Sequence, residues 1–316
     1  MRTFNINDVY IDELLNTSKL PDIFKYRCII RNNDILNEQF LNELARKINV
    51  TPSNLKMYYN WFLINDKYYY FKHYYIFEEL LMEQIFKAFD VPNVNHKIVS
   101  FNGKSGIISE NFRKQDCEYL NYEDVLPLEI DVPSHIIDYN SVIKTKMSDS
   151  DYKNYIELVS KIMAVDIMFG QFDHKYYNIM FEKSNTHLKL TPMFDNGCIF
   201  KEQASESTYV FKSCFDTLTF SLKSKNIDEH TIGTINDYPE LFKSLEATLN
   251  FNLTKIFNRL EQTYQLEIYK ELRKQIQSYY DIHCKMVEKT LKHVKWILNC
   301  KQYKNMLLYA SSKGVF

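Results

Sequence analysis

Two short polar segments of the sequence carry residues suited to phosphoryl transfer. The first contains Asp173, Lys175 and Asn178, and the second begins at Asp195, 17 residues after Asn178. If the residues between them form a hairpin, Asn178 and Asp195 come together and can bind one Mg²⁺ ion through oxygen. Asp173 is then placed to accept a proton from an attacking hydroxyl group, and Lys175 to stabilise charge on the transferred phosphoryl group. This combination predicts a phosphotransferase that uses ATP and Mg²⁺.

A lysine and a group of glutamates lie upstream, where a phosphate-binding pair is needed. Lys72 ends a predicted strand, and Glu78, Glu79 and Glu83 lie on the helix predicted after it. Kinases hold the phosphates of ATP with a strand lysine that a helix glutamate positions. We therefore expect Lys72 to bind phosphate and Glu79 to hold Lys72, with Glu83 as the other candidate partner. The alternative is an edge lysine whose alkyl chain covers apolar surface.

The patterns around these residues predict an α+β fold with two lobes, arranged as in protein kinases. Aromatic runs on both sides of Asn65-Asp66-Lys67 indicate a hairpin, and apolar residues at helical spacing indicate several helices. Gly170 is expected to end the helix that precedes Asp173. The predicted strands are 61–64, 68–72, 97–101, 106–109, 178–181 and 188–190; the predicted helices are 8–16, 35–48, 77–89, 148–169 and most of the chain from about 238, while 115–148 is expected to be rich in loops.

These elements divide the chain into three parts. We expect a helical N-terminal extension over residues 1–50 and a small β-rich lobe that ends in a hinge over 51–114. The remainder, residues 115–316, is expected to form a larger and mostly helical lobe that carries the catalytic loop.

The composition excludes several other classes of protein. The 316 residues include only 6 glycines, where average usage of about 7% would give roughly 22, so the clustered glycines of a Rossmann or Walker A loop are missing. The net charge of −1 gives no support for nucleic-acid binding. No apolar run is long enough for a membrane span, and the N-terminus lacks the apolar centre of a signal peptide. Six scattered cysteines without a C-x-x-C pair suit a reduced, cytoplasmic protein.

The segment 165–173, followed by Asn178 and by Pro192-Met193-Phe194-Asp195, resembles the HipA-like family of Ser/Thr kinases. The family pattern reads approximately D-x-L-[IL]-G-N-x-D-x-H-x-x-N, followed by P-[ILM]-[FY]-D. The resemblance implies that Asp173 is the catalytic base and that Asn178 and Asp195 hold Mg²⁺.

Two upstream features extend this resemblance. Glu79 stands eleven residues before Asp90-Val91, where these kinases have a glycine followed by an aliphatic residue. The segment 107–112 is similar to their hinge, usually written V-x-E-R-F. This implies backbone contacts to adenine near Glu110 and Phe112.

The sequence departs from the family pattern at two places that matter for catalysis. Lys175 stands where the family has a histidine, and His174 lies one residue early. The place of the phosphate loop is taken by residues 51–56, which contain no glycine. We expect Ser53 and Lys56 in this segment to bind phosphate directly.

The resemblance implies a protein substrate with a serine or threonine acceptor, autophosphorylation as an option, and an antitoxin-type protein partner. Two alternatives stay open. The spacing over 173–180 is more remotely similar to the D-R-H-x-x-N-I-[LM] pattern of phosphatidylinositol kinases, which favours a lipid or small-molecule acceptor. The glycine-free segment 51–56 favours a kinase-fold binding module with little or no catalysis, of a regulatory or DNA-associated kind. Residues 40–59 also mimic a helix-turn-helix, although we do not expect direct nucleic-acid binding or a membrane location.

Overall fold

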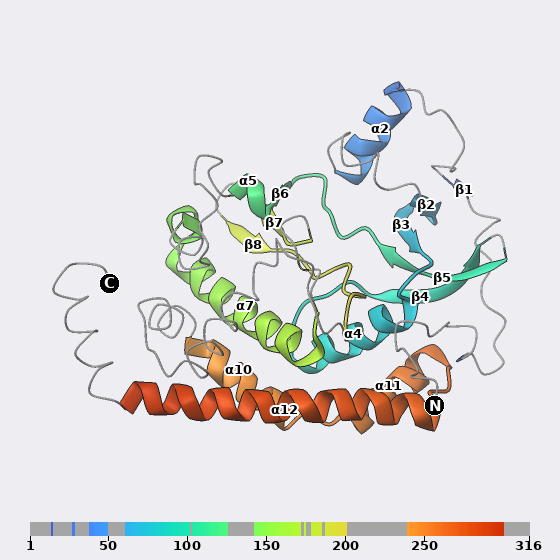
Figure 1. Cartoon of the computed structure of the whole chain (residues 1–316). Helices are drawn as coiled ribbons and strands as arrows, with labels where there is room; N and C mark the ends of the chain where they lie inside the picture. The colour runs from blue at the N-terminus through green and yellow to red at the C-terminus, as the bar shows by residue number, and fades with distance from the viewer. Residues whose placement is uncertain are drawn as a thin grey trace.

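The chain has an α+β fold with a small β-rich lobe and a larger, mostly helical lobe, which confirms the predicted fold class (Figure 1). The computed structural model describes Leu14 and residues 27–28, 38–49, 61–101, 103–125, 142–171, 174, 178–184, 187–200 and 239–299. Four residues of the predicted site lie outside these ranges: Ser53, Lys56, Asp173 and Lys175.

The small lobe is built on a five-stranded antiparallel sheet with the order β1-β2-β3-β5-β4. Its strands are β1 (Arg27–Cys28), β2 (Trp61–Ile64), β3 (Lys67–Lys72), β4 (His96–Phe101) and β5 (Lys104–Glu110). The predicted hairpin is confirmed, because Asn65 and Asp66 both have positive φ angles (49° and 61°), as a two-residue turn of this kind requires. One face of the sheet forms its own apolar cluster, which includes Phe62, Phe71 and Ile108.

Helix α4 (Ile76–Ala88) lies between the small lobe and the helical lobe and is the structural link between them (Figure 1). Every residue from Ile76 to Phe86 is buried. The helix packs against α7 and α11. Asp90, just beyond its end, has a φ of 53°. This left-handed conformation is the one that glycine adopts most readily, and it occurs where HipA-like kinases have their glycine.

The larger lobe is mostly helical, as predicted. Its long buried helix, α7 (Asp149–Phe169), is capped by Ser148, whose hydroxyl accepts a hydrogen bond from the backbone of Asp151, and ends at Gly170 with a φ of 60°. A three-stranded sheet with the order β6-β7-β8 lies beside it. The other elements are β6 (Glu118–Asn121), α5 (Tyr122–Val125), β7 (Met180–Lys183), β8 (Leu188–Leu190), α10 (Pro239–Leu249), α11 (Leu253–Tyr264) and α12 (Lys270–Asn299).

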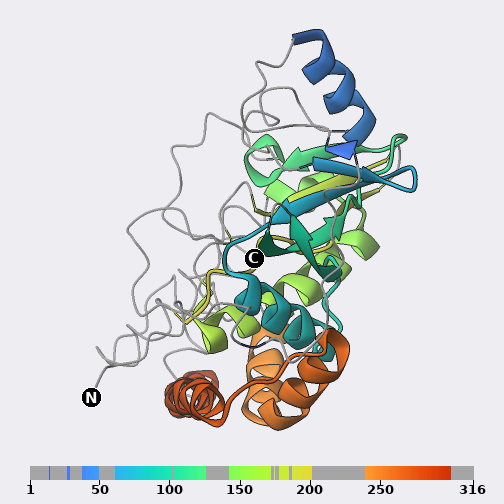
Figure 2. The same ribbon diagram turned by 90° about the vertical axis from the view of Figure 1, so that its right-hand side faces the viewer.

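The C-terminal helices form the base of the molecule. Helix α12 packs against α7 and α10, and Figure 2 views it along its axis, at the lower edge of the molecule. At the opposite end, α2 (Glu38–Ile48) lies above the small-lobe sheet (Figure 1). Among the residues that the structure describes, no helix is both long and apolar enough to cross a membrane.

Two local predictions were wrong. Part of the segment expected to be loop-rich forms β6 and α5, because β6 pairs with β7, a partner about 60 residues away that local patterns do not reveal. The hairpin between Asn178 and Asp195 was expected to bring Asp195 to its end, but β8 ends at Leu190, as the predicted strand 188–190 does. The chain then leaves the hairpin, and Met193 forms a parallel bridge with Asn93 beyond α4. This bridge brings the segment that carries Asp195 next to the small lobe.

Three other predictions lie partly outside the described residues. These are the helix over 8–16, of which only Leu14 is described, the second half of the possible helix-turn-helix over 40–59, and the glycine-free segment 51–56. The division at residues 50 and 114 stays a prediction. We note that β1 belongs to the expected extension and pairs with β2 of the small lobe.

Candidate active site

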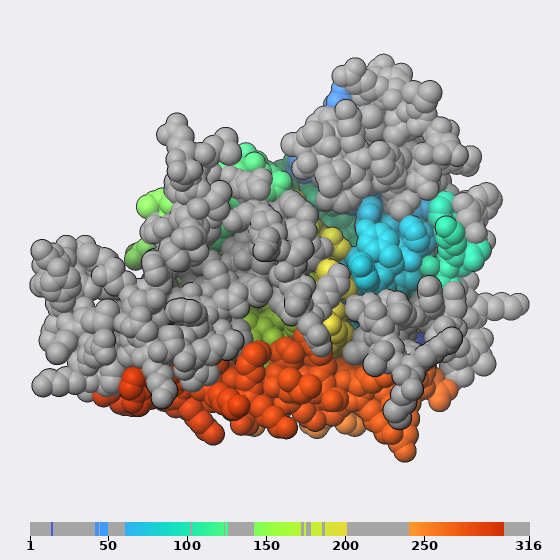
Figure 3. Space-filling model, in the orientation of Figure 1, coloured from blue at the N-terminus to red at the C-terminus, as the bar shows by residue number. Residues whose placement is uncertain are grey.

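A cleft of about 210 Å³ lies between the small-lobe sheet and the segment that follows β8. Six of the ten predicted site residues line it: Lys72, Glu79, Glu110, Phe112, Asn178 and Asp195. On the face seen in Figure 3, residues 187–200 (yellow) lie directly beside the small lobe (cyan). Residues that are more than 100 positions apart in the sequence thus share one cleft.

Lys72 is the centre of the polar contacts in this cleft. Its ammonium group donates to Glu79 Oε1 and to Asp195 Oδ1, the latter at 2.5 Å. The side chains of Lys72 and Glu79 are 8% and 1% exposed, whereas that of Asp195 is 41% exposed. Burial lowers the pKa of Lys72, but the charges of Glu79 and Asp195 outweigh this effect and raise the pKa above its usual value. Lys72 therefore stays a cation.

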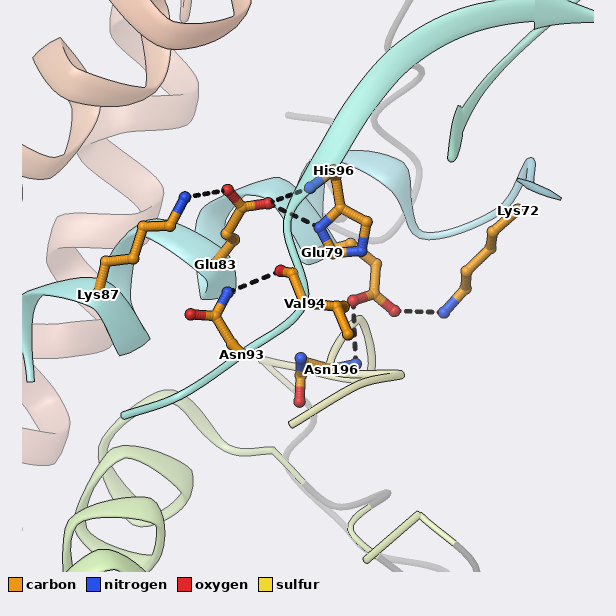
Figure 4. A network of polar contacts seen from close by, with 8 residues as sticks. All are labelled: Lys72, Glu79, Glu83, Lys87, Asn93, Val94, His96 and Asn196. Carbon is orange, nitrogen blue, oxygen red and sulfur yellow. Dashed lines mark hydrogen bonds and ion pairs between the residues drawn. The ribbon is translucent and has the colours of Figure 1, made fainter. Parts of the chain in front are cut away.

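Glu79, rather than Glu83, is the partner of Lys72, which settles the choice that the sequence left open. Its second oxygen accepts a hydrogen bond from the backbone nitrogen of Asn196 at 3.0 Å. One buried carboxylate thus joins β3, α4 and the segment that carries Asp195, as Figure 4 shows for Lys72, Glu79 and Asn196.

Glu83 lies one turn further along α4 and has different partners. It accepts from Lys87 Nζ at 2.5 Å and from the backbone nitrogen of His96 at 2.9 Å, and its Oε2 lies 2.7 Å from His96 Nδ1. Burial raises the pKa of Glu83, but the hydrogen bonds from His96 and Lys87 outweigh it, so the pKa is lowered. This second carboxylate fixes the start of β4 to α4.

The backbone around Asp195 is shaped to fit against α4. Asp195 has a φ of 56°, a conformation that costs an L-residue free energy and is often found at functional sites. Two residues later, a β-carbon on Gly197 would lie 2.6 Å from Tyr75 Cβ and 3.1 Å from Glu79 Cγ. Only glycine allows this close approach, so Gly197 sets the distance between Asp195 and the pair of Lys72 and Glu79.

Asn178 and Asp195 form a donor set that suits Mg²⁺. Asn178 is 4% exposed and lines the cleft together with Asp195. Mg²⁺ prefers hard oxygen ligands and is usually held by one or two protein groups, with phosphate oxygens and water completing the coordination. One amide and one carboxylate at the edge of a cleft fit this requirement.

His174 connects the predicted catalytic loop to the Asp195 segment. Its imidazole is fully buried, with Nδ1 2.7 Å from Asp166 Oδ2 and Nε2 2.9 Å from Asn196 Oδ1. Asp166 belongs to the buried helix α7, so this contact holds His174 against that helix. The sequence did not reveal the role of His174, because this histidine lies one residue before the position of the histidine in the family pattern. The neighbouring Asp173 and Lys175 lie outside the described residues.

The predicted hinge residues also line the cleft. Glu110 ends β5 and binds Lys67 Nζ at 2.7 Å and the Tyr69 hydroxyl at 3.3 Å. Phe112 contacts Phe194, with ring centroids 5.7 Å apart, so the hinge packs on the residue that precedes Asp195.

Sequence reasoning missed several other residues that line the cleft, among them Trp61, Tyr70 and His96. The strand pattern carried a signal for one of them. Alternate residues of a strand point to the same face, so Tyr70 must share the face of Lys72.

Comparisons with known proteins give structural matches but no sequence matches. No family model and no curated protein matches the sequence. The structure is similar to that of the proinflammatory kinase CtkA of Helicobacter pylori, with a TM-score of 0.47, 11% identity, and coverage of 74% of this chain and 92% of that one. It is also similar to HipA of a toxin–antitoxin system of Shewanella oneidensis MR-1, solved with HipB and operator DNA, with a TM-score of 0.42, 11% identity, and coverage of 72% and 60%. A HipA protein is thus among the structures that this chain resembles.

Proposed function

We propose that this chain is a HipA-like protein kinase that transfers the γ-phosphoryl group of ATP to a serine or threonine hydroxyl group of a protein. The observation that supports this most strongly is the contact of Lys72 with both Glu79 and Asp195, in a cleft that Asn178 also lines. A buried lysine–glutamate pair beside a metal-binding aspartate and asparagine is the arrangement that kinases need.

Each residue has a defined part in the proposed reaction. Lys72 binds the α- and β-phosphates, and Glu79 holds its ammonium group in place. Asn178 and Asp195 hold Mg²⁺, which neutralises charge on the phosphates when it is bound. Asp173 takes the proton of the acceptor hydroxyl as its oxygen bonds to the γ-phosphorus and the bond to the β-phosphate oxygen breaks, leaving ADP.

Three further residues complete the proposed site. Lys175 stabilises the charge of the transferred group. Ser53 and Lys56 bind phosphate in place of a glycine-rich loop. All three are assigned from the sequence.

The sequence resemblance extends the proposal to the protein's setting. On the basis of this resemblance, the proposal includes an antitoxin-type protein partner, a cytoplasmic location and autophosphorylation as an additional reaction. Direct binding to nucleic acid is not part of the proposal, since the net charge of −1 provides no basic surface overall.

The proposal is tested by the transfer of labelled phosphate from [γ-³²P]ATP with Mg²⁺. The acceptors are the protein itself, a protein lysate, and a panel of lipids and metabolites. Wild type is expected to label protein, and Asp173→Asn to lower the rate about 10²–10⁴-fold, as the loss of a general base does. Equal labelling by both proteins would overturn the assignment of Asp173.

The two alternatives give different results in this experiment. Labelling confined to lipids or metabolites would establish the same chemistry with another acceptor. A kinase-fold binding module without catalysis would label nothing. Thermal denaturation with millimolar ATP and Mg²⁺ then separates a nucleotide-binding module from a protein without a nucleotide site, because a ligand of the native state raises the melting temperature.

A further inference from the structure

Four residues form one row across the small-lobe sheet, on the side that faces the cleft. Trp61 on β2 pairs with Tyr70 on β3, Tyr70 pairs with Ser109 on β5, and Ser109 pairs with His96 on β4. Residues directly opposite each other on antiparallel strands project from the same face. All four line the cleft, so the row forms part of its wall.

The row lies next to the phosphate-binding lysine. Lys72 follows Tyr70 by two residues on β3, and two residues of a strand span about 7 Å on one face. The rings of Trp61 and Tyr70 lie 5.5 Å apart and give the row an apolar, aromatic end. A group bound against this row would therefore sit beside phosphates bound at Lys72, which is the position of the base in a nucleoside triphosphate.

His96 gives the other end of the row a polar group with a fixed direction. Its side chain is 5% exposed, and its Nδ1 is held by Glu83 Oε2 at 2.7 Å. Within the described ranges, no protein group hydrogen-bonds its Nε2. In Figure 4 this second nitrogen points away from Glu83, to the side where Glu79 and Lys72 lie. A nitrogen that lines a cleft without a protein partner is available for a ligand.

The contact with Glu83 also determines what His96 can recognise. A carboxylate only accepts hydrogen bonds, so Nδ1 carries the proton that faces Glu83. In the neutral ring Nε2 is then an acceptor. Adenine presents an amino donor at its 6-position, whereas 6-oxo purines present a carbonyl acceptor there. The neutral ring, with its Nδ1 proton facing Glu83, therefore complements adenine and opposes a 6-oxo purine.

We propose that His96, held by Glu83, accepts a hydrogen bond from the 6-amino group of adenine and makes the cleft selective for ATP over 6-oxo purine nucleotides. This inference rests on the proposed function, because it assumes that the base of a nucleoside triphosphate occupies the row. It adds a specificity-determining residue that the hinge resemblance does not supply. Glu83 acts only as a positioning residue for His96.

The test compares the binding of ATP and inosine triphosphate, which differ at the 6-position of the base. The chain has two tryptophans, and Trp296 is 52% exposed on α12. In a Trp296→Phe background, the fluorescence of Trp61 therefore reports directly on occupancy of the row. Dissociation constants for both nucleotides are measured with Mg²⁺ by this signal and checked by calorimetry.

The informative variant is His96→Asn. Its amide can take the place of Nδ1 and donate to Glu83, so the buried carboxylate keeps a partner, but it has no counterpart of Nε2. The control is His187→Asn, because His187 is an exposed histidine that contacts Asp151 at 3.1 Å. Both variants are first compared with wild type by thermal denaturation.

Wild type and His187→Asn are expected to bind ATP about tenfold more tightly than inosine triphosphate, the size of one net hydrogen bond. In His96→Asn the dissociation constants for the two nucleotides should become nearly equal, because ATP binds more weakly. Equal binding of both nucleotides by wild type, or a tenfold preference that survives in His96→Asn, would overturn this inference and leave the proposed function standing. Failure of wild type to bind either nucleotide would contradict the proposed function itself.

Discussion

The buried imidazole of His174 lies 2.9 Å from the side-chain oxygen of Asn196. This contact joins the two segments that carry the predicted catalytic residues, because Asp173 directly precedes His174 and Asp195 directly precedes Asn196. The backbone of Asn196 is in turn bound to Glu79. The predicted catalytic loop, the segment predicted to bind metal and α4 are therefore joined by one continuous set of buried contacts.

The first prediction concerns this contact. Replacing His174 and Asn196 by alanine, singly and together, should reveal a coupling of about 1 kcal/mol in the free energy of unfolding, since buried neighbours in one network are not additive. Urea denaturation measures it. Asn250→Ala, which removes an exposed contact with the carbonyl of Glu246, should show no coupling with His174→Ala. Additive effects in the first cycle would show that the contact does not join the segments.

A second prediction compares two lysines of β3. Lys72→Met leaves the buried carboxylate of Glu79 without its cation and should cost about 3–5 kcal/mol of unfolding free energy. Lys67→Met breaks the exposed pair with Glu110 and should leave the stability nearly unchanged. Chemical denaturation of both variants tests this. A Lys72→Met protein as stable as wild type would contradict the buried pair.

A third prediction separates two glycines. Gly197→Ala forces a β-carbon against Tyr75, so it should lower the stability by about 1–3 kcal/mol and weaken ATP binding by moving Asp195. Gly103→Ala has a φ of 73° and open space around the new atom. It should cost stability through backbone strain alone and leave ATP affinity unchanged. Calorimetric titration with ATP and Mg²⁺ distinguishes them, and equal affinities would disprove the role of Gly197.

The fourth prediction is a pH dependence that arises from Glu83. Its pKa in the folded chain lies below the ordinary value of 4.5, so its contribution to stability is present above 4.5 and is lost as the pH falls through the lower, folded value. Melting temperatures measured from about pH 7 to about pH 3 should fall less steeply for Glu83→Gln than for wild type. Glu118→Gln, at an exposed pair with Lys183, should follow wild type. If the melting temperatures of Glu83→Gln and wild type fell equally with pH, Glu83 would not be the source of the pH dependence.

Local patterns were sufficient for the elements that carry the site. The turn at Asn65-Asp66 and the end of the helix at Gly170 are both short-range features, and each was predicted correctly from the residue types. The six predicted site residues that lie in the described ranges also share one cleft.

What the sequence could not supply depends on contacts between distant segments. Glu79 and Glu83 are one turn apart on α4, so periodicity cannot distinguish them; the position of His96 on another strand does. The bridge between Asn93 and Met193, which carries the chain to Asp195, likewise has no local signal.

The measurement that tests the proposed site most directly is the rate of phosphoryl transfer from [γ-³²P]ATP by wild type, Asp195→Asn and Asp281→Asn, with folding of each protein verified beforehand. Asp281 is an acidic residue of α12 that contacts Gln277 and lies outside the cleft lining, so its variant serves as the matched control. We predict transfer by wild type and by Asp281→Asn at similar rates, and a rate about 10²–10³-fold lower for Asp195→Asn, as for the loss of one group that stabilises transition-state charge. A folded Asp195→Asn protein that transfers phosphate at the wild-type rate would contradict the assignment of this cleft as the catalytic site.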